Sequence, residues 1–262
     1  MESKHTIKQR QWFKRMMGAM AGTSILPEMP PASEYEIDEM YGALDSLPEV
    51  LFGAYAFSRE PLCGRLSASE QYTWTCRAIN CGREQAIALN VAYGTKDPSA
   101  LAQKMGIKTF ERERPEKGAR ILFAQFVEPD EITVFSDCLH RLAAEKAERS
   151  LPLEVQTVKN ILLAHELFHT VETRTPGILT VQRHLSLWKL LGYDYRSSIQ
   201  CLSEIAAMAF AAELMEIFWS PYILDPILVN LYNRQAGAQL FAQIQRLTES
   251  WTPLLNKTQS NL

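Results

Sequence analysis

The sequence predicts an α+β fold that is mostly helical, with one small antiparallel sheet beside a central helix. Apolar residues recur at helical spacing over residues 67–93, 151–173 and 227–247. The spacing becomes that of strands only between residues 119 and 137. With 262 residues, 47% of them hydrophobic, the chain can form one large domain or one domain with an appendage.

Charge and cysteine content disfavour several classes of protein. The net charge of −3 and the pI near 6.0 provide no basic field, so we do not expect sequence-independent binding to nucleic acid or to an anionic membrane. No apolar run approaches the length of a membrane span. The five cysteines form no C-x-x-C pair, which is typical of reduced thiols rather than of disulfides or a cysteine zinc site. We therefore expect a soluble, cytoplasmic protein.

The N-terminal region, residues 1–66, is predicted to form an arm and a helical extension that precede a main domain of residues 67–262. Residues 4–15 are basic and precede an uncharged stretch, which fits either a weak signal peptide or a basic amphipathic helix or loose arm. A linker follows, with the proline-rich sequence PEMPPA. Residues 34–52 then have the spacing of a short helix, and a break at residues 61–64 marks the edge of this region.

The first long helix of the main domain has clear end signals. Ser67 followed by Glu70 fits a capping box, and Gly94 ends the proline-free stretch. A short helix should begin with Pro98. The sequence SALAQKMGIKTF also resembles the opening of a helix-turn-helix DNA reader, built on residues 100–107. An Ala-rich helix stopped by glycine before a strand is common in many folds, so we do not expect nucleic-acid binding.

Two apolar runs predict a β-hairpin. They lie at residues 121–127 and 132–135 and are separated by Glu-Pro-Asp-Glu. The hairpin either offers an edge for an extended ligand or only covers the core.

The helix predicted for residues 151–173 contains the sequence HELFH. His165 and His169 are four residues apart and therefore lie one above the other on the helix, where both imidazoles can bind one metal ion. Glu166 can then contact a water at that metal. A single inward histidine is more often a hydrogen-bonded core residue, but two at this spacing with the glutamate indicate a catalytic zinc site.

Catalytic zinc usually has three protein ligands, so a third is needed. The best candidate is Glu204, in the sequence CLSEIAAMAFAAELM. On a helix that begins near Ser203, the alanines beside Glu204 would let two helices approach closely. The alternative is a surface glutamate on an Ala-rich packing helix.

The C-terminal part is predicted to be helical after a break at SPYILDP. Residues 227–247 should form one amphipathic helix, and residues 256–262 a polar tail.

HELFH followed by SEIAAMAFAAELM resembles the ImmA/IrrE family of bacterial metallo-endopeptidases. The zinc motif of that family is commonly followed by Glu-x-x-Ala, often extended as Ala-Asn-x-Phe-Ala, and here Met208 replaces the asparagine. The resemblance covers residues 99–215. It implies a zincin-like domain of the gluzincin type, with one Zn²⁺ held by His165, His169 and Glu204, with Glu166 as catalytic base, and with regulatory cleavage of a protein such as a repressor.

Peptide hydrolysis would also need a donor for the negative oxygen of the transition state. The candidates are His140, His184, Tyr193 and Tyr195. An Asp, a Glu or a backbone carbonyl should hold the second nitrogen of each ligand histidine.

Three functions follow from these patterns. The first is a zinc endopeptidase acting on a protein or peptide. The second is a metal-binding regulatory or interaction protein without proteolytic activity. The third is a DNA-binding regulator built on residues 100–107.

Overall fold

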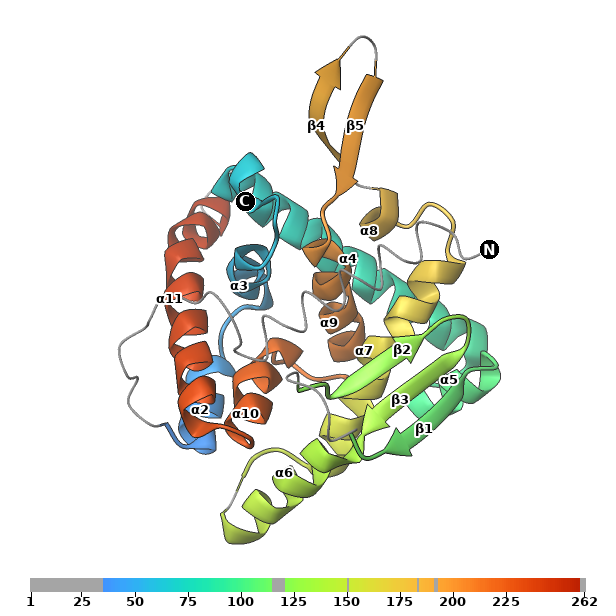
Figure 1. The fold of residues 1–262 in the computed structure, drawn as a ribbon, viewed down its shortest axis with the longest axis vertical. Coiled ribbons are helices and arrows are strands. Elements are labelled where there is room, and N and C mark those ends of the chain that lie inside the picture. The colour runs from blue at the N-terminus through green and yellow to red at the C-terminus, as the bar shows by residue number, and fades with distance from the viewer. Residues whose placement is uncertain (1–34, 115–120, 150, 183, 191–192, 260–262) are drawn as a thin grey trace.

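Helices α7 (Val155–Arg174) and α9 (Cys201–Met215) lie at the centre of the fold, and α4 (Ala68–Tyr93) packs along α9 (Figure 1). The computed structural model describes residues 35–114, 121–149, 151–182, 184–190 and 193–259. The basic arm and its signal-peptide alternative lie outside the described residues. Apolar residues surround α9 on all sides, which explains why it is buried between α4 and α7.

The contact between α4 and α9 is unusually close. A Cβ atom at Gly82 of α4 would lie 2.1 Å from the carbonyl oxygen of Ala206 on α9. Small residues on both helices therefore let the backbones touch. The predicted ends of α4 are confirmed, because Ser67 and Glu70 form a capping box and Gly94 has a positive φ of 67°.

The described part of the N-terminal region packs into the same core as the rest of the chain. It contains α2 (Ile37–Leu44), η1 (Glu49–Leu51), α3 (Phe52–Ser58) and η2 (Cys63–Arg65). Phe52, Tyr55 and Phe57 of α3 are almost completely buried. The proposed boundary between residues 66 and 67 stays a prediction, but the hydrophobic core extends across it.

The main sheet is mixed, so the prediction of a purely antiparallel sheet is wrong. The predicted hairpin is confirmed as β2 (Ala124–Val127) and β3 (Glu131–Phe135), which pair antiparallel. A further strand, β1 (Lys108–Arg112), pairs parallel with the other edge of β3. The sequence of β1, KTFER, has one apolar residue and no alternation, because this strand is largely exposed on both faces.

Strand β1 follows α5 (Pro98–Lys104) directly, with Asp97 as the N-cap of α5. The segment from residue 100 to residue 112 is therefore a helix followed by a strand, and a second helix does not follow as in a helix-turn-helix reader. The sheet packs on α7 through β2 and β3 (Figure 1). Helix α6 (Ser136–Glu148) continues from β3.

A second hairpin was not expected from the sequence. After α8 (Leu179–Gln182), strands β4 (His184–Leu190) and β5 (Tyr193–Ser198) pair antiparallel. This hairpin extends away from the rest of the fold (Figure 1). The prediction of a single sheet is therefore wrong.

The C-terminal part contains two helices where one was predicted. Leu224–Asn230 forms α10, preceded by η3 (Pro221–Ile223), and Arg234–Gln259 forms α11. The side chain of Asn233 accepts a hydrogen bond from the N–H of Ala236 at 2.9 Å and starts the new helix. Helical spacing continues across this break, which is why the periodicity alone did not reveal it. Among the helices that the structure describes, none has the length and apolar composition of a membrane span.

Candidate metal centre

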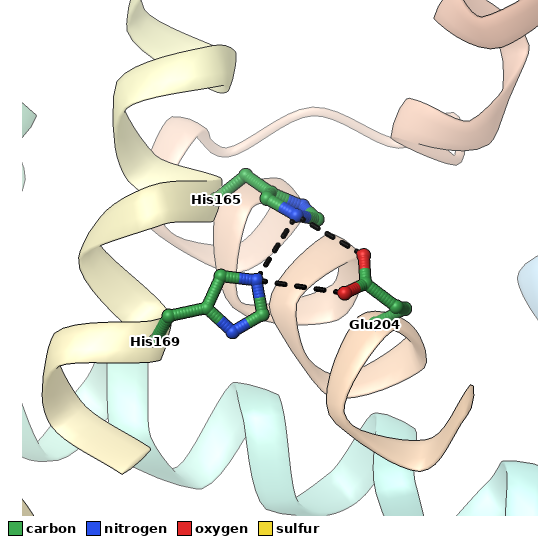
Figure 2. A group of neighbouring side chains, drawn as sticks. All are labelled: His165, His169 and Glu204. Carbon is green, nitrogen blue, oxygen red and sulfur yellow. Dashed lines mark hydrogen bonds and ion pairs between the residues drawn. The ribbon is translucent and has the colours of Figure 1, made fainter. Parts of the chain in front are cut away.

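The two histidines of HELFH point from α7 toward α9 (Figure 2). Their Nε2 atoms lie 3.3 Å apart. His169 is buried and His165 is half-buried. The helical spacing that predicted a shared metal ion therefore brings the two imidazoles together.

Glu204 in the first turn of α9 completes the cluster (Figure 2). Its Oε2 atom lies 3.3 Å from His165 Nε2, and its Oε1 atom lies 3.7 Å from His169 Nε2. The side chain is only about 6% exposed. The alternative of a surface glutamate is therefore wrong for Glu204.

The geometry of these three residues fits a divalent metal ion of the size of zinc. Ligand bonds of about 2.0 to 2.1 Å in a tetrahedron place neighbouring ligand atoms about 3.3 to 3.4 Å apart. The separations of 3.3 Å between the two Nε2 atoms and between His165 Nε2 and Glu204 Oε2 match this spacing. Glu204 Oε1 is buried and has no hydrogen-bond partner among the described residues. A zinc ion bound among these atoms would give Glu204 Oε1 a partner. The same ligands also suit other divalent ions.

The position of Glu204 depends on a residue that the sequence did not indicate. Helix α9 has no side-chain cap of its own. The carboxylate of Glu60, which follows α3, accepts hydrogen bonds from the N–H groups of Gln200 and Cys201 at 2.7 and 3.0 Å. Glu60 is buried and belongs to the N-terminal region. This region therefore supplies the negative charge at the start of the helix that carries Glu204.

The second nitrogen of His169 has polar neighbours, as expected. Its Nδ1 atom lies 3.3 Å from Ser203 Oγ and 3.6 Å from Glu172 Oε2, and Ser203 donates to Glu172 at 2.8 Å. Nδ1 of His165 is buried and has no hydrogen-bond partner in the described part of the chain. The expected supporting group is therefore present for His169, and none is found for His165 among the described residues.

The carboxylates around the histidines attract positive charge. Burial alone would lower the pKa of His169, but its contact with Glu172 and the charges of Glu204 and Glu166 raise it to about 9. Burial would also raise the pKa of Glu204, but the contact with His165 and the charge of His169 hold it below its ordinary value. Without a metal, a proton on His169 supplies part of the charge that a divalent cation would bring.

Glu166 lies beside the cluster and is fixed to the sheet. Its Oε2 atom accepts a hydrogen bond from the backbone N–H of Phe126 on β2 at 2.7 Å. Burial raises the pKa of the Glu166 carboxyl, and the neighbouring histidines oppose this rise. A carboxylate with a raised pKa is suited to accept and return a proton.

A small cavity of about 60 Å³ adjoins His165, Glu166 and Glu204. Volumes of this size hold a few water molecules. The other residues around it are mainly apolar and come from β2 and the residue before it, α7, α9, η3 and α10; they include Phe123, Ala124, Ile161, Leu162, Met208 and Leu228.

Three further polar residues line this cavity and were missed in the sequence. They are Arg59, Tyr222 and Asp225. Arg59 follows α3, Tyr222 lies in η3 and Asp225 lies in α10, so they are far from HELFH in the chain. No spacing rule connects these segments, so the sequence contained no signal that these three residues meet at one cavity.

The predicted donors for the transition-state oxygen fall into two groups. His140 is exposed on α6 and does not line the cavity. His184 lies on β4, and Tyr193 and Tyr195 lie on β5, but their side chains are outside the described part of the structure. The proposal of His140 is not supported, and the other three stay predictions.

Comparison with protein-family models, with curated proteins and with solved structures finds no match to this chain. Membership of the ImmA/IrrE family therefore remains a prediction from the residues quoted above.

Proposed function

We propose that the protein is a zinc-dependent endopeptidase that hydrolyses a peptide bond in a protein substrate. The observation that supports this most strongly is the convergence of His165, His169 and Glu204 beside the buried Glu166. The resemblance to ImmA/IrrE peptidases points to a gluzincin-type, zincin-like domain and to a regulatory protein, such as a repressor, as substrate. The free cysteines are compatible with the cytoplasm as the place of action.

In the proposed reaction, His165, His169 and Glu204 would hold the zinc ion. Bound zinc acts as a Lewis acid that polarises a carbonyl group and lowers the pKa of water. Glu166 takes a proton from the attacking water through the carboxylate oxygen that does not bond to Phe126. The same carboxyl then gives this proton to the leaving amine.

Strand β2 is suited to position an extended substrate. In an antiparallel pair, amides that bond to the neighbouring strand alternate with amides that face away from it. Phe126 donates its N–H to Glu166, so it faces away from β3, and Ala124 has the same orientation two residues earlier. Ala124 also lines the cavity. A peptide strand added at this edge of β2 would lie beside Glu166.

The experiment compares zinc-loaded wild-type protein with the Glu166→Gln variant on a library of peptides derived from bacterial proteins. Cleavage would be followed by mass spectrometry and zinc content by elemental analysis. We expect Glu166→Gln to keep zinc and to cleave at least about 100-fold more slowly, since a general base contributes about 100- to 10,000-fold. Glu84→Gln, on the exposed surface of α4, is the matched control.

A metal-binding regulatory protein without proteolysis is the second candidate. The small cavity favours it, because an extended peptide needs more room. A biological effect that survives Glu166→Gln with zinc still bound would exclude the peptidase and support this candidate.

A further inference from the structure

A buried tyrosine and a half-buried arginine line the cavity next to the proposed metal ligands without belonging to the His-Glu-x-x-His motif. They are Tyr222 and Arg59. Both carry hydrogen-bond donors. Their surroundings indicate which substrate atom they receive.

Arg59 is held in one orientation by two neighbours. Its Nη1 atom lies 3.6 Å from Asp225 Oδ2, and its guanidinium lies 4.0 Å from the ring centre of Tyr55. Tyr55 donates its hydroxyl to the same Asp225 oxygen at 2.9 Å. Arg59 Nη1 is nevertheless buried and has no hydrogen-bond acceptor among the residues that the structure describes.

Tyr222 presents a second donor of the same kind. Its ring is stacked on Phe52 and meets Tyr55 edge to face, so aromatic contacts fix its position. The hydroxyl is buried and has no hydrogen-bond partner within the described ranges. Burial raises the pKa of Tyr222 well above its ordinary value, so the hydroxyl keeps its proton and remains a donor.

Two buried donors without acceptors destabilise the folded protein unless a ligand satisfies them. Both line the cavity that also contains His165, Glu166 and Glu204. The acceptor they fit is therefore an oxygen atom of a molecule bound at that place.

We propose that Arg59 and Tyr222 donate hydrogen bonds to the oxygen of the substrate carbonyl as it becomes negative during attack by water. This inference rests on the proposed peptidase function and adds the residues that stabilise its transition state. Asp225 already balances the charge of Arg59, the charge of Glu204 acts on Arg59, and Glu166 lines the same cavity. The pair therefore suits an oxygen that develops charge during the reaction better than a permanent carboxylate.

The test measures binding of two probes to the zinc-loaded protein. A phosphinic pseudodipeptide with a carboxamide end imitates the tetrahedral, negative oxygen, whereas phenylethanethiol reaches the metal through sulfur and offers no oxygen. We expect Tyr222→Phe to weaken phosphinate binding by about 10- to 100-fold and to leave thiol binding unchanged. Its melting temperature should not fall, because the lost hydroxyl has no partner in the described structure.

Tyr232→Phe is the matched control. The hydroxyl of Tyr232 donates to Asp137 at 2.6 Å, and this tyrosine does not line the cavity. The control should lower the melting temperature and keep wild-type affinity for both probes. Arg59→Lys keeps the charge beside Asp225 but loses the planar fork, and should also weaken phosphinate binding selectively.

Other results would overturn the inference. Equal loss of thiol and phosphinate binding in Tyr222→Phe would mean a distorted metal site. A second phosphinate with a carboxylate in place of the carboxamide end separates another possibility. If Tyr222→Phe weakens the binding of this phosphinate only, Tyr222 recognises a terminal carboxylate. If wild-type protein fails to bind zinc or the thiol, the proposed function itself fails; if both bind and Tyr222→Phe has no effect, only the role of Tyr222 and Arg59 fails.

Discussion

Helices α7 and α9 contribute to the same candidate metal site by different means. On α7, two histidines and a glutamate lie within five residues, and the helix itself sets their relative positions. On α9, a single carboxylate depends on how the whole helix is placed against its neighbours. That placement involves Glu60 at the N-terminus of α9 and Gly82 along its side.

The difference shows that one half of the cluster is robust to changes in distant residues and the other half is not. Disturbing the packing of α9 should move Glu204 while leaving the spacing of the two histidines intact. The described N-terminal region thus supports the site through Glu60, which caps α9, and Arg59, which lines the cavity.

Removing a ligand from either helix should have the largest effect. His165→Ala and Glu204→Ala should each weaken zinc binding by on the order of several hundred-fold, because three ligands share a binding free energy of about 10 kcal/mol or more. Zinc content and competition with a fluorescent chelator measure this. His140→Ala, an exposed histidine on α6, is the control and should bind zinc as wild type does. Bound zinc that persists in both ligand variants would rule out the coordination.

Gly82→Ala tests the close contact behind α9. The added Cβ would meet the backbone of Ala206 and Phe210, which cannot rotate away, so α4 and α9 must separate. We expect a loss of about 1 to 3 kcal/mol in the free energy of unfolding, together with weaker zinc binding. Denaturant unfolding and zinc titration measure both.

Gly42→Ala on α2 is the matched control, because its Cβ would meet nothing within 4 Å. It should stabilise the protein by up to about 1 kcal/mol, since alanine favours a helix. If Gly82→Ala behaves like Gly42→Ala, α9 does not depend on this contact.

Glu60→Gln tests the borrowed cap of α9. The amide keeps the shape of the side chain but removes the negative charge from the group that accepts hydrogen bonds from Gln200 and Cys201. We expect the free energy of unfolding to fall by about 1 to 3 kcal/mol and zinc affinity to fall less than in Gly82→Ala. Glu70→Gln changes the exposed cap of α4 and should leave zinc affinity unchanged. Equal zinc affinities in the two variants would argue against a role for Glu60 at the site.

A further effect concerns the pH dependence of the metal-free protein. The pKa of His169 rises from about 6.5 in the unfolded chain to about 9 in the folded protein. A raised pKa gives stability that is complete below the unfolded value and is lost as pH rises through the folded value. Stability should therefore fall between about pH 6.5 and pH 9 in wild type.

Urea unfolding at several pH values measures this slope. His169→Gln should remove it, and saturating zinc should suppress it because the bound metal replaces the proton. A wild-type slope that survives in His169→Gln would assign the effect to another group.

The sequence predicted most of the helices and the hairpin of β2 and β3, because capping residues and apolar spacing act locally. Apolar alternation did not indicate β1, whose sequence is KTFER, or the hairpin of β4 and β5. The prediction from the sequence merged α10 and α11, because the apolar spacing continues across the break at Asn233. Of these features, β1 depends on a distant segment, because it pairs with β3.

The same division holds for the site. The sequence by itself determined that His165 and His169 share one side of a helix and that Glu166 is next to them, because helical geometry relates nearby residues without help from the rest of the chain. It also indicated Glu204 as the candidate for a third ligand, and the structure places Glu204 beside the two histidines. Only the tertiary structure decided how Glu204 reaches the histidines and that Arg59 and Tyr222 line the same cavity. These residues lie on separate helices and loops, so packing and buried charge, rather than spacing along the chain, set their distances.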